Sequence, residues 1–195
     1  MDHGIDNKLK KTLQEYKELF TLYEEAPVPS ASDILLNIFN LSGEDILKNK
    51  QYWHRHLGAC WEKLVKSVFS SRADYQHAVR IHKKSPCDFA FSDKAIDTKY
   101  RLGSGDSGTL EKLAKNAAWL RTLGYFPVML ILRSDNLPNA LSRMSGAGWR
   151  VLTGDDCFEF IRCHGGLDLK KYMLSLTTFH LASPEEKPPN HFEGL

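Results

Sequence analysis

The sequence lacks the features that mark several large classes of protein. None of its apolar runs approaches the ~18 residues that a membrane-spanning helix needs, so we expect no membrane partner. Residues 1–6 show no basic patch followed by an apolar stretch, and we therefore see no secretory signal. Only four cysteines occur in 195 residues, which is too few for a disulfide scaffold. We expect a protein of a reducing, intracellular compartment.

Two familiar cofactor motifs are also missing. Cys157, Cys163 and His164 lack the C-x-x-C spacing of a structural zinc site, which favours a packing role for the cysteines. The glycine-rich loop 102–109 is not closed by the Gly-Lys-Ser/Thr of a Walker loop. The strand expected before this loop carries charges at its centre, unlike the strand of a dinucleotide-binding fold. The loop is therefore either a flexible turn or a contact for phosphate groups of a partner.

Positive charge is scarce at both ends of the chain and concentrated in its middle. Residues 48–84 carry nine Lys or Arg against two Asp or Glu, and residues 85–153 carry nine against six. By contrast, residues 1–47 carry four against nine, and residues 154–195 carry four against seven. A basic centre suits a polyanionic partner, although a solvated charged face gives the same pattern.

Apolar residues make up 42% of the chain, enough for a sizeable core. Their spacing is helical in the first third, alternates in short runs after that, and then switches between the two periods. We expect helices over residues 7–25, 33–39, 52–70, 109–123, 139–145, 155–163 and 167–176. We expect strands over residues 77–84, 87–91, 95–100, 126–133 and 149–153.

This order of elements predicts an α/β fold with a mixed central sheet flanked by helices. Residues 92–94 are short enough for a hairpin turn, which would make the strands on either side antiparallel neighbours. We expect an N-terminal helical segment over residues 1–47, a main domain over 48–182 and a flexible tail over 183–195. Ser32 is expected to cap the second helix.

Two acids and a lysine stand in the two strands of this expected hairpin. Asp97 and Lys99 are two residues apart, so their side chains share a face of the strand. Hairpin pairing would bring Asp88 close to Asp97. Two carboxylates that close repel each other unless a divalent cation neutralises them, and oxygen ligands with room for water suit Mg²⁺. With a lysine beside them, this set suits hydrolysis of a phosphodiester, although solvated ion pairs show the same spacing.

The segment CDFAFSDKAIDTKYR, together with Glu62 on the preceding helix, resembles the PD-(D/E)XK nuclease superfamily, and within it the type II restriction endonucleases. The resemblance covers about residues 55–135. It implies a restriction-endonuclease-like fold in which Asp88 and Asp97 bind Mg²⁺. It also implies that Lys99 positions or activates the attacking water and that Glu62 assists at the catalytic site.

Basic and hydroxyl side chains lie on both sides of these acids in the sequence. Contact with DNA phosphates is one role for them, and a solvated surface is the other. The residues that we expect to contact DNA are Arg80, Lys83, Lys84, Arg101, Ser104, Ser107 and Lys112. Residues 53–56 also mix aromatic and basic character, but Trp53 is more typical of a core residue than of a base-stacking platform.

The resemblance implies a Mg²⁺-dependent endonuclease that cleaves double-stranded DNA at a short specific sequence, in the cytoplasm of a prokaryote. A symmetric DNA site is usually read by a two-fold protein, so we expect a homodimer with the terminal helices as its candidate interface. The chain departs from the family pattern at one position, where Cys87 separates Pro86 from Asp88. Two alternatives stay open: a DNA-repair or junction-resolving nuclease of the same fold, and a non-enzymatic DNA-binding protein.

Overall fold

The structure, a computed structural model, describes residues 3–21, 33–80, 85–102 and 107–177. The expected tail and part of the glycine-rich loop lie outside these residues. Within the described ranges, helices and strands follow one another largely as the hydrophobic pattern indicates. No helix in these ranges is long and apolar enough to cross a membrane.

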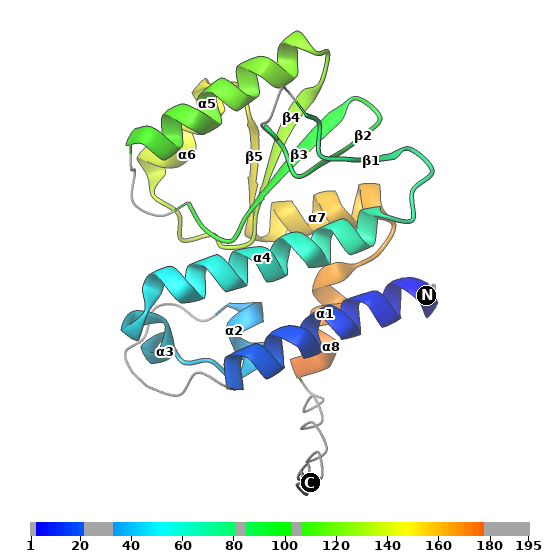
Figure 1. The fold of residues 1–195 in the computed structure, drawn as a ribbon, viewed down its shortest axis with the longest axis vertical. Coiled ribbons are helices and arrows are strands. Elements are labelled where there is room, and N and C mark those ends of the chain that lie inside the picture. Colours follow the sequence, from blue (N-terminus) through cyan, green and yellow to red (C-terminus); the bar gives the residue numbers. More distant parts are fainter. Residues whose placement is uncertain (1–2, 22–32, 81–84, 103–106, 178–195) are drawn as a thin grey trace, which may run out of the picture.

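Five strands form one open mixed sheet in the order β1-β2-β3-β4-β5 (Figure 1). The first three strands are antiparallel neighbours, and the last two run parallel to β3. The strands are β1 (Tyr75–His77), β2 (Phe89–Phe91), β3 (Lys94–Lys99), β4 (Phe126–Ile131) and β5 (Arg150–Thr153). The expected hairpin between β2 and β3 is confirmed, as is the α/β class with a mixed sheet flanked by helices.

One face of the sheet is covered by α4 (Lys50–Phe69) and α7 (Gly154–Gly165). The apolar stripe of α4 packs on alternate residues of the strands, among them Ile96 and Val128. Trp53 of α4 is 1% exposed and belongs to this core, as the sequence suggested.

The opposite face of the sheet is covered by α5 (Ser107–Thr122) and α6 (Pro138–Gly146) (Figure 1). Here the other alternate set of strand residues, including Ala95 and Met129, packs against the helices. Because side chains alternate along a strand, β3 therefore contributes to both cores.

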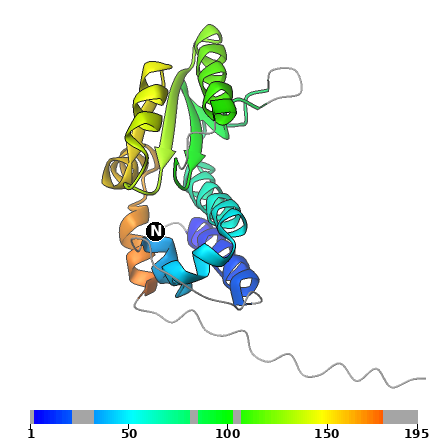
Figure 2. The ribbon, with the colours of Figure 1, turned by 90° about the vertical axis from the view of Figure 1, so that its left-hand side faces the viewer.

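Helix α4 also separates the sheet from a second layer of helices (Figure 1). This layer lies at the end of the molecule away from α5 and α6 (Figure 2). It consists of α1 (His3–Thr21), α2 (Ile34–Phe39), α3 (Gly43–Lys48) and α8 (Leu169–Thr177). Leu9, Leu13, Leu35 and Leu36 of this layer are buried in the same core as α4. The role of these helices in a dimer interface stays a prediction.

Two local predictions are wrong. The first strand is Tyr75–His77, because Tyr75 stacks on Phe89 of β2 at 5.7 Å between ring centroids and fixes the pairing earlier in the chain than expected. Residues 78–80 belong to no strand, and residues 81–84 of the expected strand lie outside the described residues. The cap of α2 is Asp33 rather than Ser32, since the Asp33 carboxylate accepts hydrogen bonds from two backbone N–H groups of the first turn.

Candidate functional site

Asp88 lies where β2 and β3 begin to pair. Its backbone N–H donates to the carbonyl of Ile96, one step beyond the Phe89–Ile96 pair of the ladder. One carboxylate oxygen, Oδ2, accepts hydrogen bonds from both the backbone N–H and the hydroxyl of Thr98, each at 2.7 Å. The side chain of Asp88 thus extends the ladder along β3 and is held in a fixed position beside Asp97.

Asp97 and Lys99 form an ion pair in the second half of β3. Oδ2 of Asp97 lies 2.5 Å from Nζ of Lys99, and the Asp97 side chain is only 8% exposed. The contact is not aligned as a hydrogen bond, and this buried oxygen has no other hydrogen-bond partner in the described part of the chain. A nearly buried carboxylate with so little hydrogen bonding is costly to a fold, which points to a role other than packing.

The charges at this place are electrostatically coupled. The pKa of Asp97 is raised to about 6: burial is the largest cause, Asp88 and Glu62 also raise it, and Lys99 lowers it. Burial alone would lower the pKa of Lys99, but Asp97, Asp88 and Glu62 together raise it above its usual value. Lys99 is therefore protonated at neutral pH. The structure thus brings all four expected catalytic residues within electrostatic reach of one another.

Glu62 reaches the cluster from α4, where it forms an ion pair with Lys66 one helical turn later. Burial alone would lower the pKa of Lys66, yet Glu62 and Asp88 raise it. Lys66 is thus a second ammonium group of the cluster. Sequence analysis did not single it out, although its i,i+4 spacing from Glu62 was a usable signal.

The cluster offers two strand carboxylates, Asp88 and Asp97, as metal ligands. Within the described residues, no group of three or more His, Cys, Asp or Glu side chains is arranged to hold a metal ion. Two carboxylates nevertheless fit Mg²⁺, because this ion is usually held by one or two carboxylates and keeps waters or substrate phosphate oxygens as its other ligands. The under-bonded oxygen of Asp97 supplies the observation that supports this fit.

A groove of about 200 Å³ opens beside the cluster. One wall is a face of α4, and the other is the end of β3 with the two residues that follow it. Its lining residues are His54, Gly58, Glu62, Thr98, Lys99, Tyr100 and Arg101. The candidate catalytic groups Glu62 and Lys99 are therefore accessible from this groove.

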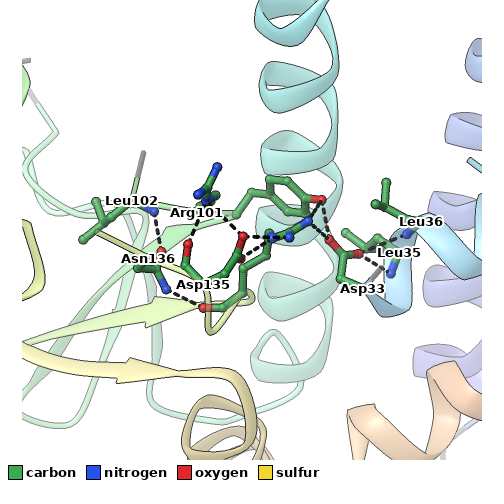
Figure 3. A network of polar contacts seen from close by, with 9 residues as sticks. Asp33, Leu35, Leu36, Arg101, Leu102, Asp135 and Asn136 are labelled. Atoms are coloured by element: carbon green, nitrogen blue, oxygen red, sulfur yellow. Dashed lines mark hydrogen bonds and ion pairs between the residues drawn. The ribbon is translucent and has the colours of Figure 1, made fainter. Parts of the chain in front are cut away.

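A polar network fixes the backbone directly after β3 (Figure 3). Arg133, whose side chain is 5% exposed, donates to Asp33 at 3.0 Å and to Asp135 at 2.5 and 2.9 Å. Nε of Arg101 donates to the backbone carbonyl of Asp135 at 3.0 Å. Asn136 accepts from the backbone N–H of Leu102 at 2.7 Å. The network links the start of α2 to the chain that follows β3 and β4.

The expected DNA contacts lie in different parts of the chain. Lys83, Lys84 and Ser104 lie outside the described residues, and Ser107 begins α5 with a side chain that is not described. Arg80 is exposed in the segment that follows β1 and belongs to no helix or strand. Lys112 lies on α5 at a separate cavity of about 500 Å³. Among the expected contacts whose side chains the structure describes, only Arg101 lines the groove beside the candidate cluster.

Comparison with known proteins gives no relative to set beside this geometry. No family model, no curated protein and no solved structure matches the chain. The functional argument therefore depends on the site itself.

Proposed function

We propose that this protein is a Mg²⁺-dependent endodeoxyribonuclease that hydrolyses phosphodiester bonds of double-stranded DNA. The observation that carries the proposal is the buried Asp97–Lys99 ion pair, electrostatically coupled to Asp88 and Glu62 at the end of β3. Because neighbouring carboxylates disfavour one another in a buried place, a purely structural role gives no reason to gather them there.

Asp88 and Asp97 are the residues that would hold Mg²⁺. When bound, the ion would polarise the phosphoryl oxygens and favour ionisation of a water molecule. Asp88 is already oriented by its two hydrogen bonds from Thr98. This leaves its other oxygen, Oδ1, as the atom that would face the ion.

The two lysines supply positive charge where the reaction builds negative charge. The protonated ammonium of Lys99 would donate to the attacking water or to a phosphate oxygen as the phosphorus is attacked in line. Lys66 holds Glu62 through their ion pair, so that the Glu62 carboxylate can accept a hydrogen bond from water at the same site. These residues therefore have separate roles: metal ligation by Asp88 and Asp97, and charge stabilisation by Lys99.

The basic middle of the chain supports a polyanionic substrate. In its most specific form, our proposal is a homodimeric type II restriction endonuclease that cleaves at a short sequence and leaves a 5′-phosphate and a 3′-hydroxyl. A repair or junction-resolving nuclease would use the same cluster on mismatched or branched DNA. A binding protein without activity would have no need of the buried Asp97.

The test is incubation of the purified full chain with a long bacteriophage DNA, with and without Mg²⁺. The wild type is compared with Asp97→Asn and Lys99→Ala, and with Lys170→Ala as the control. Lys170 is a matched lysine because it forms an ion pair with Asp155 at 2.6 Å on the exposed surface and belongs to α8, not to the cluster.

Discrete fragments that require Mg²⁺, Asp97 and Lys99, but not Lys170, are the expected result. A smear with the same requirements would retain the nuclease and replace sequence specificity with a repair or non-specific activity. Cleavage by Lys99→Ala at the wild-type rate would overturn the assigned mechanism. Absence of cleavage of phage DNA and of mismatched or branched duplexes would overturn the proposed activity.

A further inference from the structure

The groove beside the cluster has a regular construction. His54, Gly58 and Glu62 are spaced i, i+4 and i+8 on α4, so they form one row along the helix about 12 Å long. Facing them, Lys99 and Arg101 are two residues apart at the end of β3. Glu62 is coupled to Lys99 and His54 to Arg101, so the groove has a catalytic end and a second end.

Arg101 presents a partly unpaired guanidinium at the second end of the groove. Arg101 is anchored through Nε to the carbonyl of Asp135, while neither of its Nη atoms has a hydrogen-bond or ion-pair partner among the residues that the structure describes. Burial lowers the pKa of His54, Arg101, Arg133 and Lys50 lower it further, and Asp135 raises it. Because Arg133 is paired with Asp33 and Asp135, the two Nη atoms of Arg101 are the charged donors left for an anion at this end.

His54 lies beside an aromatic ring that is fixed in position. The His54 ring lies 6.0 Å from the Tyr100 ring, and Tyr100 is fixed by Asp33 and Arg133. No hydrogen bond to the His54 ring occurs within the described part of the chain. Its ring nitrogens are therefore available to a ligand in the groove.

Gly58 lines the groove between its two ends, midway between His54 and Glu62 on α4. A glycine inside a helix is unfavourable relative to alanine. Steric crowding does not require it here, because an added Cβ would lie 3.9 Å from Cβ of Tyr100, an ordinary van der Waals contact. A larger side chain at this position would reduce the volume of the groove, because Gly58 lines it.

We propose that the second end of the groove binds the DNA phosphate next to the scissile one. Arg101 and His54 would be the ligands of this phosphate, and the absence of a side chain at Gly58 would leave the room for it. This inference rests on the proposed nuclease function and extends it. The fork of the Arg101 guanidinium suits a phosphate, and the imidazole of His54 donates one further hydrogen bond. The neighbouring phosphate would thereby place the scissile one at Lys99.

The test uses deoxythymidine 3′,5′-bisphosphate as the probe, in metal-free buffer with the full chain. Imidazole signals of His54 are followed by nuclear magnetic resonance, and those of His77, an exposed histidine of β1, serve as the internal control. We expect the His54 signals to shift in a saturable manner while those of His77 do not. Arg101→Ala is expected to weaken binding at least tenfold. Gly58→Leu is expected to abolish it, with folding checked by circular dichroism.

Cleavage by the same variants separates the two proposals. If the wild type cleaves DNA and both Arg101→Ala and Gly58→Leu cleave and bind the probe equally well, the groove proposal is overturned and the nuclease stands. If no DNA is cleaved but the probe binds at His54, the nuclease fails while the phosphate site stands. Unchanged His54 signals at saturating probe would overturn the phosphate site in either case.

Discussion

Tyr100 donates a hydrogen bond to Asp33, so the residue that follows Lys99 is tied to the residue that caps α2. The same Asp33 carboxylate pairs with Arg133, which follows β4. The second layer of helices is therefore connected to the end of β3, where the candidate catalytic cluster lies, through one largely buried carboxylate.

We predict that Arg133→Ala lowers the free energy of unfolding by about 3 kcal/mol or more. The replacement leaves the Asp33 carboxylate, 12% exposed, without its charged partner, and breaking a buried ion pair in this way costs about 3–5 kcal/mol. Urea unfolding followed by circular dichroism measures the change. Arg162→Ala, which removes an exposed pair with Glu159, is the control and should leave the urea midpoint nearly unchanged.

The double variant Arg133→Ala with Asp33→Asn tests the cause. If the cost arises from the stranded carboxylate, removing that charge recovers part of the lost stability and the two changes are not additive. Additive effects would show that Arg133 stabilises the fold through its packing or its bonds to Asp135 and Tyr100 rather than through Asp33.

Mg²⁺ should raise the melting temperature of the wild type. A ligand at ten times its dissociation constant stabilises the native state by about 1.4 kcal/mol, or about 3–6 °C for a chain of this size. The shift should disappear in Asp88→Asn and Asp97→Asn and persist in Lys170→Ala. Differential scanning fluorimetry with and without EDTA measures it. An equal shift in all four proteins would place the ion elsewhere.

Periodicity was enough to predict most of the fold and to bring together Asp88, Asp97 and Lys99 of the candidate cluster, whereas Glu62 came from the family resemblance and Lys66 was missed. Asp97 and Lys99 share a face because a strand alternates, and the short turn after β2 aligns Asp88 with them. These are local consequences of spacing. The position of β4, parallel to β3, follows similarly from its nearly uniform apolar composition.

The remainder of the site depends on contacts between distant segments. Arg133 pairs with Asp33, which lies 100 residues earlier in the chain, and no pattern in either segment predicts the pair. His54 lines the groove together with Arg101 only because α4 packs beside the end of β3. The β-branched side chains of residues 77–84 predict a strand there, whereas the strand that pairs with β2 begins at Tyr75. Burial and pairing, rather than propensity, decide such cases.

Thiol reactivity should identify Cys163 as the accessible cysteine. Cys60, Cys87 and Cys157 are buried, and burial raises the pKa of Cys87 to about 11, so little reactive thiolate forms there near neutral pH. Cys163 is exposed, although its hydrogen bond to Glu159 also raises its pKa. Titration with Ellman's reagent at pH 8 should modify one thiol in the native protein and four in denaturant. Rapid modification of Cys87 would contradict the packing beside Asp88.

Gly58→Ala should separate stability from activity. Alanine favours the helix by about 0.5–1 kcal/mol over glycine, and the new methyl group meets only Cβ of Tyr100 at an ordinary distance. We therefore expect a higher urea midpoint. Because the methyl group projects toward the groove, we also expect weaker DNA binding, measured by fluorescence anisotropy without metal, and slower cleavage.

Gly146→Ala provides the matched control, since Gly146 ends α6 and an added Cβ there meets nothing within 4 Å. This variant should keep wild-type DNA binding and cleavage. If Gly58→Ala bound and cleaved DNA as tightly and quickly as Gly146→Ala, the glycine would not serve the groove. If it bound and cleaved less well while unfolding at higher urea, the cause could not be a loosened fold, and the groove itself would be the part of the molecule that DNA requires.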